Sequence, residues 1–406
     1  MYFRRTIEHV IQNISKNFSV LLLTGARQVG KTTILSSCSP ERQKVSLDTL
    51  KMRQEAQQEP DLFLSSHPAP LLIDEIQYAP ELLPSIKSIV DQKKEMSMYW
   101  ITGSQQFHIM QNVAETLTGR MVILNLGGLS IPEIMGQPDT ERFLPTKDWL
   151  HKRTQTVKEI SYLDLKEIIW RGQYPALYET NQDQYWASFY DTYLQSYVSR
   201  DIRDLGNVGN EMHFFNLLNL LAARVGQLIN YSDLARSLTC SVPTVMQWIS
   251  ILQATGIIYV LRPFSSNINT RITKMPKIYF LDTGLLCYLL NLTAPANLDN
   301  PLVSGLIFEN FVIAEIIKDF WHHGLRPRIS FYRDHNKREV DLLIEENCTI
   351  YPIEIKKKSN PDRHDIENFK VLSSGHLQVG EGVVICSATQ PYPITKDVMA
   401  VPLFYI

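Results

Sequence analysis

The sequence predicts an α/β chain in three parts: a domain with a mostly parallel sheet, a helical and winged-helix middle segment, and a second α/β domain. Three observations predict this division. Short apolar runs alternate with helical patterns up to about residue 135, aromatic-rich helical patterns fill 160–230, and strand patterns return after about 275. The expected boundaries are 1–136 for the first domain, 137–229 for a linker and helical segment, 230–270 for the winged helix-turn-helix, and 271–406 for the last domain.

The first domain is expected to form its sheet from strand-sized apolar runs separated by helices, the pattern of βαβ units. These runs lie at 19–23, 44–47, 70–73, 99–102 and 121–126. The chain then turns polar at 137–160, which we interpret as a linker or an exposed surface helix. For the aromatic residues that follow at helical spacing, core and interface packing is the favoured interpretation.

The middle segment ends in the order of a winged helix-turn-helix. A helix at 232–238 and a short turn precede a second helix, which Ser241 can cap and which has Pro243 in its first turn. Gly256 ends that helix before a strand at 257–261. In the last domain a long helix at 305–322 is expected among several strands. These strands are 277–281, 330–332, 340–344, 350–355 and 383–386.

The composition excludes several classes of protein. Hydrophobic residues make up 44%, charged residues 20%, and the net charge is −2, so retention on nucleic acid by bulk charge alone is excluded, whereas a local basic patch is not. The five cysteines are scattered and form no CxxC pair, which argues against a disulfide framework or a cysteine-rich zinc site. Without a bilayer-spanning apolar run or a signal-peptide pattern, we expect a cytoplasmic protein with no membrane partner.

The strongest motif follows the first expected strand and opens a helix, which is the context that a phosphate-binding loop requires. It fits G-x-x-x-x-G-K-[ST], and its glycines allow backbone N–H groups to close around phosphate oxygens. Lys31 is expected to reach the β and γ phosphates of ATP, and the Thr32 hydroxyl to bind Mg²⁺. The residues expected around the nucleotide are Gly25, Ala26, Arg27, Gln28, Val29, Gly30, Lys31, Thr32 and Thr33.

Two acids end the strand at 70–73, at the sheet edge where ligands bind in such folds. Asp74 is expected to hold Mg²⁺, directly or through water, and Glu75 to act as the general base on the attacking water. A strand at 44–47 separates the loop from these acids in the sequence, as in the additional-strand class of P-loop ATPases.

Two further residues are candidates for catalysis. Ser104 ends the next strand, where a polar residue commonly lies between the acids and the γ-phosphate, and Gln105 is the second choice. Arg120, just before the last strand of the domain, can reach the γ-phosphate of a neighbouring subunit in a homo-oligomer. A plain surface arginine is an equally good interpretation of Arg120.

The last domain contains a second group of charged residues. Glu354 and Lys356 lie two apart on one expected strand and so share a face, and Asp341 begins the adjacent strand of a hairpin. Asp341 and Glu354 can bind Mg²⁺ and position a water against a phosphodiester, with Lys356 stabilising the charged transition state. Glu309 lies on an otherwise apolar helical stripe, where a metal site would explain it. Exposed Glu and Lys on ordinary strands are the competing interpretation.

The expected recognition helix, 241–254, contains no Lys or Arg, so we favour a packing role for it over insertion into DNA. The following wing has four basic residues and no acid. It can contact phosphates, or it can be a solvated loop. Its basic residues are Arg262, Arg271, Lys274 and Lys277.

Nearly the whole chain resembles the prokaryotic AAA-type ATPases that carry a carboxyl-terminal DUF4143 domain (AAA_14 plus DUF4143). The resemblance implies an AAA-like module, a winged-helix segment and a carboxyl-terminal domain related to PD-(D/E)xK nucleases. Lys31, Thr32, Asp74 and Glu75 match the family's ATPase motifs, and Glu309, Asp341, Glu354 and Lys356 match its nuclease-like motif. The matching pieces are residues 25–33, 71–77, 102–104, 117–120, 197–201, 278–285, 308–310, 339–341 and 353–356.

Three hypotheses follow. The chain is an Mg²⁺-dependent ATPase whose nucleotide state drives a nuclease-like domain on DNA, or it is an ATP-dependent switch with a catalytically inactive nuclease-like domain. A protein-remodelling ATPase ranks last, because no substrate-threading pore motif is evident.

Overall fold

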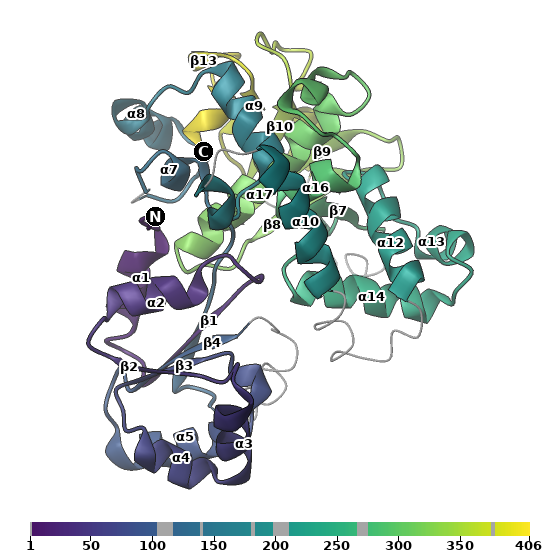
Figure 1. The fold of residues 1–406 in the computed structure, drawn as a ribbon. Helices are drawn as coiled ribbons and strands as arrows, with labels where there is room; N and C mark the ends of the chain where they lie inside the picture. The colour runs from purple at the N-terminus through teal and green to yellow at the C-terminus, as the bar shows by residue number, and fades with distance from the viewer. Residues whose placement is uncertain are drawn as a thin grey trace.

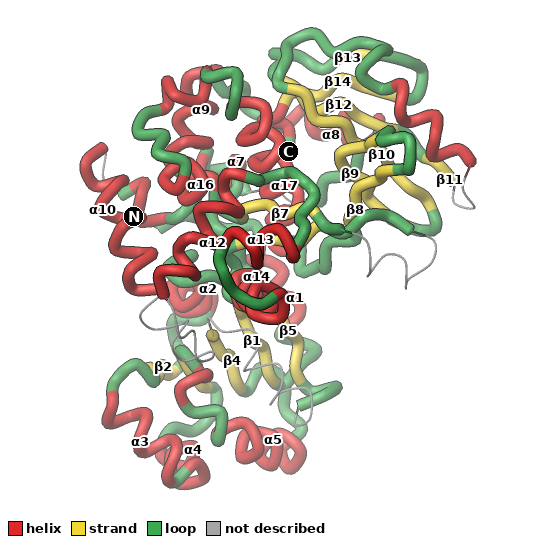
Figure 2. Tube along the Cα trace, turned by 90° about the vertical axis from the view of Figure 1, so that its right-hand side faces the viewer, coloured by secondary structure: helices red, strands yellow, loops and turns green. Residues whose placement is uncertain are grey.

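The computed structural model describes residues 2–103, 117–138, 141–179, 183–197, 211–265, 275–374 and 378–406. Two sheets stand apart in it: a five-stranded sheet in the amino-terminal lobe and a seven-stranded sheet in the carboxyl-terminal lobe, with helices between and around them (Figures 1 and 2).

The amino-terminal sheet is parallel and has the order β2-β3-β4-β1-β5. The strand β4 therefore lies between β1, which precedes the phosphate-loop motif, and β3, which ends in the acids. The strand β2 separates the two motifs in the sequence but lies at the sheet edge in space. The strands are β1 (Val20–Thr24), β2 (Gln43–Ser46), β3 (Leu71–Asp74), β4 (Tyr99–Gly103) and β5 (Met121–Asn125).

The three inner strands β1, β3 and β4 are buried along their whole length and are mostly apolar, as expected for strands covered on both faces, whereas the edge strand β2 exposes Gln43 and Lys44. Alternate side chains belong to different cores: Leu21 and Leu23 pack in the core that includes α1 and α2, whereas Val20 and Leu22 pack in the core that includes α3, α4 and α5. The two helical layers lie on opposite sides of the sheet (Figure 1). The helices are α1 (Ile7–Ile14), α2 (Lys31–Cys38), α3 (Leu50–Gln58), α4 (Pro60–Ser66), the 3-10 turn η1 (Ile76–Tyr78) and α5 (Leu82–Lys93).

The polar stretch after this domain contains a helix that docks on the carboxyl-terminal lobe. On α8, Trp149 and Leu150 are buried while most of the remaining residues are exposed. Arg153 donates a 2.6 Å hydrogen bond to the carbonyl of Tyr405. The predicted surface helix therefore exists and bridges to the far end of the chain. The elements here are α7 (Ile131–Ile134) and α8 (Lys147–Thr156).

The aromatic stripe of the middle segment packs as a core, as predicted. The rings of Trp170 and Trp186 stack with centroids 4.5 Å apart, and Tyr190 is fully buried. The Tyr190 hydroxyl donates a 2.7 Å hydrogen bond to the buried carboxylate of Asp282. The helical elements are α9 (Tyr162–Arg171), η2 (Pro175–Tyr178), α10 (Asp183–Tyr197) and α12 (Glu211–Ala223).

A helix, a turn, a second helix and a strand follow in the expected order. Ser241 caps the second helix by accepting a hydrogen bond from the backbone N–H of Thr244. One expectation is wrong: the strand at 277–281, which we grouped with the last domain, pairs with β6 and not with the carboxyl-terminal sheet. Period-2 apolar patterns show that a strand forms but not which strand it pairs with. The elements are α13 (Tyr231–Ser237), α14 (Val242–Ala254), β6 (Ile258–Leu261) and β7 (Lys277–Phe280).

The carboxyl-terminal sheet is mixed and has the order β13-β14-β12-β10-β9-β8, with β11 beside β10. Its centre is the predicted antiparallel hairpin of β9 and β10. The helices before it are α16 (Thr283–Leu289), η4 (Pro295–Asp299) and α17 (Ser304–His322). The remaining elements are β8 (Ile329–Arg333), β9 (Glu339–Glu346), β10 (Thr349–Lys356), η5 (Glu367–Ser374), β11 (Gln378–Val379), β12 (Gly382–Cys386), β13 (Tyr392–Pro393), β14 (Val398–Pro402) and η6 (Leu403–Tyr405).

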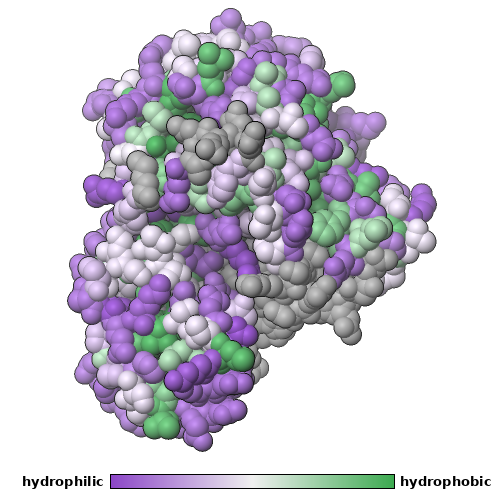
Figure 3. Space-filling view, in the orientation of Figure 1, coloured by the Kyte–Doolittle hydropathy of each residue, from purple (hydrophilic) through white to green (hydrophobic). Residues whose placement is uncertain are grey.

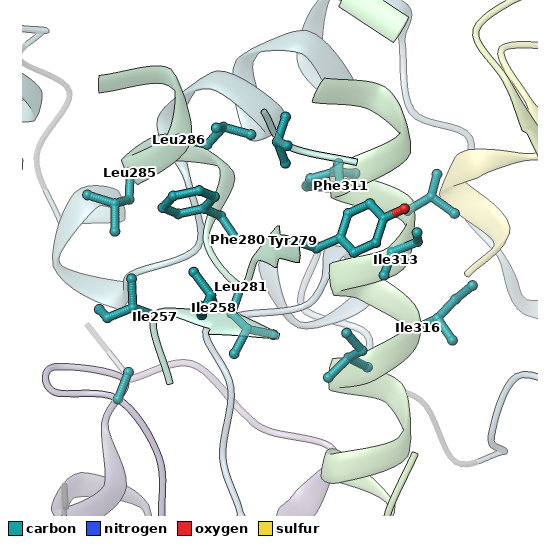
Figure 4. Close-up of a cluster of buried hydrophobic side chains, with 14 of the residues drawn as sticks. Ile257, Ile258, Tyr279, Phe280, Leu281, Leu285, Leu286, Phe311, Ile313 and Ile316 are labelled. Atoms are coloured by element: carbon teal, nitrogen blue, oxygen red, sulfur yellow. The ribbon is translucent and has the colours of Figure 1, made fainter. Parts of the chain in front are cut away.

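One hydrophobic core crosses all the predicted boundaries, from Ile7 in α1 to Ile406 at the carboxyl end. At its centre the β6–β7 hairpin, α16 and α17 meet, with side chains such as Phe280, Leu285 and Phe311 packed together (Figure 4). On the face shown in Figure 3, hydrophobic residues form small patches among hydrophilic ones, as is ordinary for a protein surface. Within the described ranges, none of the helices combines the length and the apolar character needed to cross a bilayer.

Candidate functional site

The phosphate-loop motif forms the turn between β1 and α2. Gly25 has φ +149°, and a Cβ there would lie 2.1 Å from the carbonyl oxygen of Leu126, so glycine is required at this position. The loop ends at Gly30, and α2 begins at Lys31. The backbone N–H groups of the first helical turn therefore lie next to the loop, as in anion-binding helix termini.

The ammonium of Lys31 is buried and held by the loop itself. It donates hydrogen bonds to the carbonyls of Gly25 at 3.0 Å and of Ala26 at 2.8 Å. Gln28 in the same loop has φ +63°, a conformation that non-glycine residues adopt only where the surroundings enforce it. The loop is thus curled around the lysine side chain that was predicted to bind phosphate.

The acids lie beside the start of α2. Asp74 ends β3, and its Oδ1 accepts hydrogen bonds from the hydroxyls of Thr32 and Thr102, the latter at 2.6 Å. The oxygen of Thr102 in turn accepts the backbone N–H of Glu75 at 3.0 Å. A hydroxyl in contact with a carboxylate is the donor set that Mg²⁺ uses beside phosphate oxygens. The residues at this position therefore fit the predicted ion.

Glu75 stands just outside the strand in a strained backbone conformation. Its φ of +61° is uncommon for a residue with a side chain, and such residues cluster at functional sites. The amide of Gln77 donates a hydrogen bond to Glu75 Oε2. Glu75 is half-buried in this turn, whereas Asp74 is buried at the strand end.

Sequence reasoning missed Thr102, although it lies within one of the matching pieces. We nominated Ser104, two residues later, which lies outside the described residues. The signal for Thr102 was its place at the end of β4, the strand inserted between β1 and β3. That insertion brings Thr102 within hydrogen-bond reach of both acids.

Arg120 lies at the opposite edge of the sheet from the loop of its own chain. It precedes β5, whose Met121 is level with Val20 at the start of β1, whereas the loop follows the end of β1. Its guanidinium pairs with Asp91 of α5. Arg120 therefore cannot reach a nucleotide on its own loop, and a role across a subunit boundary stays a prediction.

The middle segment packs against the loop. A Cβ at Gly256, in the turn between α14 and β6, would lie 3.2 Å from the backbone nitrogen of Ala26. A cavity of about 100 Å³ lies beside this contact and is lined by Gly25, Ala26, Gly127, Gly256, Asp282 and other residues. The loop is therefore a contact surface between the first domain and the helix-turn-helix segment.

The charged residues of the carboxyl-terminal hairpin also come together. Lys356 Nζ lies 2.7 Å from Glu354 Oε1 and 3.8 Å from Asp341 Oδ2. The other oxygen of Glu354, Oε2, is buried and has no hydrogen-bond partner among the described residues. Burial and the nearby Asp341 carboxylate raise the pKa of Glu354 to about 8. The predicted arrangement of Asp341, Glu354 and Lys356 is present in space.

Glu309 faces this cluster from α17 but has partners that sequence reasoning missed. The hydroxyl of Tyr279 donates a 2.6 Å hydrogen bond to Glu309 Oε1, and the buried ammonium of Lys277 lies 3.5 Å from the same oxygen. Lys277 also pairs with Glu339 at 2.5 Å. Burial raises the pKa of Glu309, although the charge of Lys277 opposes this. Both partners come from β7, so the winged segment closes one side of the cluster.

Within the ranges that the structure describes, no group of three or more His, Cys, Asp or Glu side chains is arranged to hold a metal ion. Binding of a metal by Asp341 and Glu354 therefore stays a prediction. The pairing of Glu309 with Lys277 and Tyr279 explains its place on the apolar stripe without a metal.

Three family models match consecutive parts of the chain. The family described as an AAA domain (AAA_14) matches residues 17–135, a domain of unknown function (DUF8612) matches 162–296, and a domain of unknown function (DUF4143) matches 304–406. Uncharacterized protein Rv2008c of Mycobacterium tuberculosis is 27% identical over 385 residues, which cover 94% of this chain and 80% of the relative. Uncharacterized protein Mb2031c of Mycobacterium bovis matches to the same extent.

Solved structures resemble the chain more loosely. The Walker-type ATPase PabY2304 of Pyrococcus abyssi is 14% identical, with a TM-score of 0.39, and the match covers 71% of this chain and 96% of that chain. The RuvB Holliday junction branch migration motor of Thermotoga maritima is 17% identical, with a TM-score of 0.30. The match covers 62% of this chain and 85% of that chain. Superpositions this loose carry no argument about function. From the family matches the chain carries an AAA-type ATPase-like domain at residues 17–135 and a DUF4143 domain at residues 304–406.

Proposed function

We propose that the chain binds and hydrolyses ATP with Mg²⁺. The observation that carries this proposal is the hydrogen-bonded chain from Thr32 through Asp74 and Thr102 to the backbone of Glu75, directly beside the phosphate loop. This chain of hydrogen bonds joins Thr32 and Asp74, which are suited to bind Mg²⁺, to Glu75, which is suited to activate water. Thr32 comes from the start of α2, Asp74 and Glu75 from the end of β3, and Thr102 from the end of β4, so only the folded sheet assembles them.

In this proposal the phosphate loop, the two acids and Ser104 have different tasks. The N–H groups of residues 25–33 surround the phosphates, and the Lys31 ammonium exchanges its two carbonyl partners for β and γ phosphate oxygens. Thr32 and Asp74 hold Mg²⁺, which neutralises charge on the transferring phosphoryl group. Glu75 accepts the proton of the attacking water at its carboxylate, and it lies in the strained turn directly after β3. Ser104 remains the candidate for contact with the γ-phosphate.

We further propose that nucleotide state is coupled to a DNA-interacting, nuclease-like carboxyl-terminal domain. The support is the set of Asp341, Glu354 and Lys356, together with the buried Glu354 Oε2 that lacks a hydrogen-bond partner among the described residues. A buried carboxylate oxygen without a donor is costly, and a bound cation would satisfy it. In this role Asp341 and Glu354 bind the metal, Lys356 stabilises charge, and Glu309 completes the cluster.

A second candidate function is an ATP-dependent switch whose nuclease-like domain is inactive. The observation that favours it is the capture of Glu309 by Lys277 and Tyr279. A carboxylate held by an ammonium and a phenol is poorly placed to bind a metal. DNA contact then falls to the helix-turn-helix and its wing, although α14 has no Lys or Arg to offer the major groove. In the wing, Lys277 is buried and paired with acids, and residues 266–274, with Arg271 and Lys274, lie outside the described residues.

ATP binding and turnover should separate in two variants. Lys31→Ala should weaken ATP binding by about 100-fold or more, because a charge-assisted contact to phosphate is lost. Glu75→Gln should still bind ATP but lower the turnover number by about 10²- to 10⁴-fold. Calorimetry and phosphate release measure the two effects. The matched control is Glu81→Gln on the exposed start of α5, and undiminished turnover in Glu75→Gln would show that the base is another residue.

Thr102→Val should lower the turnover number of ATP hydrolysis by about 10- to 100-fold with little change in KM. The substitution keeps the shape of the side chain but removes the hydroxyl that joins Asp74 to the backbone of Glu75. Steady-state kinetics against Thr156→Val, an exposed threonine on α8, tests this. Equal kinetic constants in both variants contradict a positioning role for Thr102.

Arg120→Ala should lower turnover by about 10³-fold if the arginine acts on the γ-phosphate of a neighbouring subunit. A mixture of Arg120→Ala with Glu75→Gln should then regain activity. In mixed assemblies an intact Glu75 site can face an intact Arg120 from the other variant. A mixture no more active than the sum of its parts contradicts this, as does full activity of Arg120→Ala alone.

Metal-dependent cleavage of DNA distinguishes the two functions of the carboxyl-terminal domain. If the domain is a nuclease, the protein should nick plasmid in Mg²⁺ or Mn²⁺, and Asp341→Ala and Lys356→Ala should each lower the rate by about 100-fold or more. Asp397→Ala, an exposed acid of the same domain, should cut like the parent. Equal cutting by parent and both site variants indicates contamination, and cutting by none supports the switch.

A further inference from the structure

The guanidinium of Arg5 is buried and joins the phosphate loop to three other parts of the chain. Its Nη1 donates to the carbonyl of Val29 at 3.0 Å, and its Nη2 donates to the carbonyls of Gly127 and Gly128, both at 2.9 Å. Its Nε donates to Glu133 Oε2 at 2.7 Å. A planar guanidinium with five N–H donors can make these contacts at once, whereas no other side chain can.

The contact with Val29 bears on the direction of the Gly30 N–H, which the proposed function places among the groups that bind phosphate. Val29 and Gly30 share one planar trans peptide, so its carbonyl and the N–H of Gly30 point in opposite directions. Arg5 holds this carbonyl, so the N–H of Gly30 points to the side opposite the Arg5 guanidinium. Gly30 has φ +96°, a conformation that favours glycine, and it is the residue directly before α2.

The other partners of Arg5 lead to α17 of the carboxyl-terminal lobe. His322 Nδ1 lies 3.2 Å from Glu133 Oε1, and His322 Nε2 accepts the backbone N–H of Gly127 at 3.3 Å. Burial disfavours the ionised form of Glu133, but Arg5 and His322 outweigh burial and hold the pKa of Glu133 below its usual range. The cluster is therefore a charged, buried junction between the loop and the last turn of α17.

A second pair fixes α17 to the same strand end. Lys318 donates to the carbonyl of Leu129 at 2.8 Å and pairs with Glu315, whose other oxygen accepts the N–H of Ile131 at 3.1 Å. A Cβ on Gly127 would lie 2.7 Å from Lys318 Cγ, so the backbone there is pressed against α17. Residues 127–131 cannot shift without moving α17, and Arg5 bonds to two of them.

We propose that Arg5 is a positioning residue that orients the loop peptide between Val29 and Gly30 for phosphate and, through Glu133 and His322, transmits nucleotide binding to α17. This inference rests on the proposed ATP binding. It gives α17, which carries Glu309 at its other end, a direct mechanical link to the nucleotide site. Coupling free energy is reciprocal, so if ATP binding strengthens the contacts of His322, the loss of those contacts should weaken ATP binding by the same free energy.

The test uses the full chain and ATP with Mg²⁺, with Arg4→Lys as the matched control for Arg5→Lys. Arg4 is the exposed neighbour, and Lys at position 5 keeps a charge for Glu133 but cannot span Val29 and residues 127–128 together. In the parent and in Arg4→Lys, ATP should slow amide hydrogen exchange both at 28–31 and at 315–322. In Arg5→Lys, ATP affinity should fall by about tenfold and the protection at 315–322 should disappear.

His322→Ala tests the same coupling from the side of α17. It also tests the inference if Arg5→Lys does not fold. It should weaken ATP binding although His322 lies on the carboxyl-terminal helix. A purely structural role for Arg5 would lower the thermal midpoint but leave ATP-dependent protection of 315–322 in place, and that result overturns the inference. Unchanged ATP affinity in both variants also overturns it. If the parent itself binds no ATP, the proposed function fails and the inference fails with it.

Discussion

The structure depends on one constraint: a face of the amino-terminal sheet is buried in a core that it shares with the other parts of the chain. Leu21 and Leu23 of β1 belong to the same continuous core as α17 and the last residues of the chain. The opposite face, with Leu22, closes on helices of its own domain. Because the phosphate loop follows β1 directly, it lies at the border of the shared core, and the middle segment packs against it at Gly256.

Charged pairs mark the places where this core joins different parts of the chain. Arg5 with Glu133, Lys318 with Glu315, and Lys277 with Glu309 are all buried or nearly so. Apolar packing alone tolerates sliding, whereas a buried ion must meet its partner to offset the loss of hydration. Such pairs therefore select one arrangement of the lobes. They also place a carboxylate of the candidate nuclease-like cluster under the influence of β7, a strand of the middle segment.

Much of the candidate nucleotide site follows from local sequence. The glycine spacing, the strand before it and the two acids after β3 each require only a short window, because backbone geometry and strand-end position act locally. The hairpin that brings Asp341 near Lys356 is local in the same sense. Thr102 was missed because its role depends on β4 lying between β1 and β3, which is a matter of sheet order. Lys277 and Tyr279 were missed because β7 pairs outside the sheet to which its position along the chain assigned it.

The sequence by itself determined the class of each segment, the phosphate-loop chemistry and the alternation that puts Glu354 and Lys356 on one face, because periodicity and motif spacing are encoded in neighbouring residues. Only the tertiary structure decided what surrounds those groups. Contacts between residues as distant as Arg5 and His322 depend on how whole lobes pack, and no short window of sequence records that. The same holds for Glu309, whose spacing suggested a metal and whose neighbours are an ammonium and a phenol.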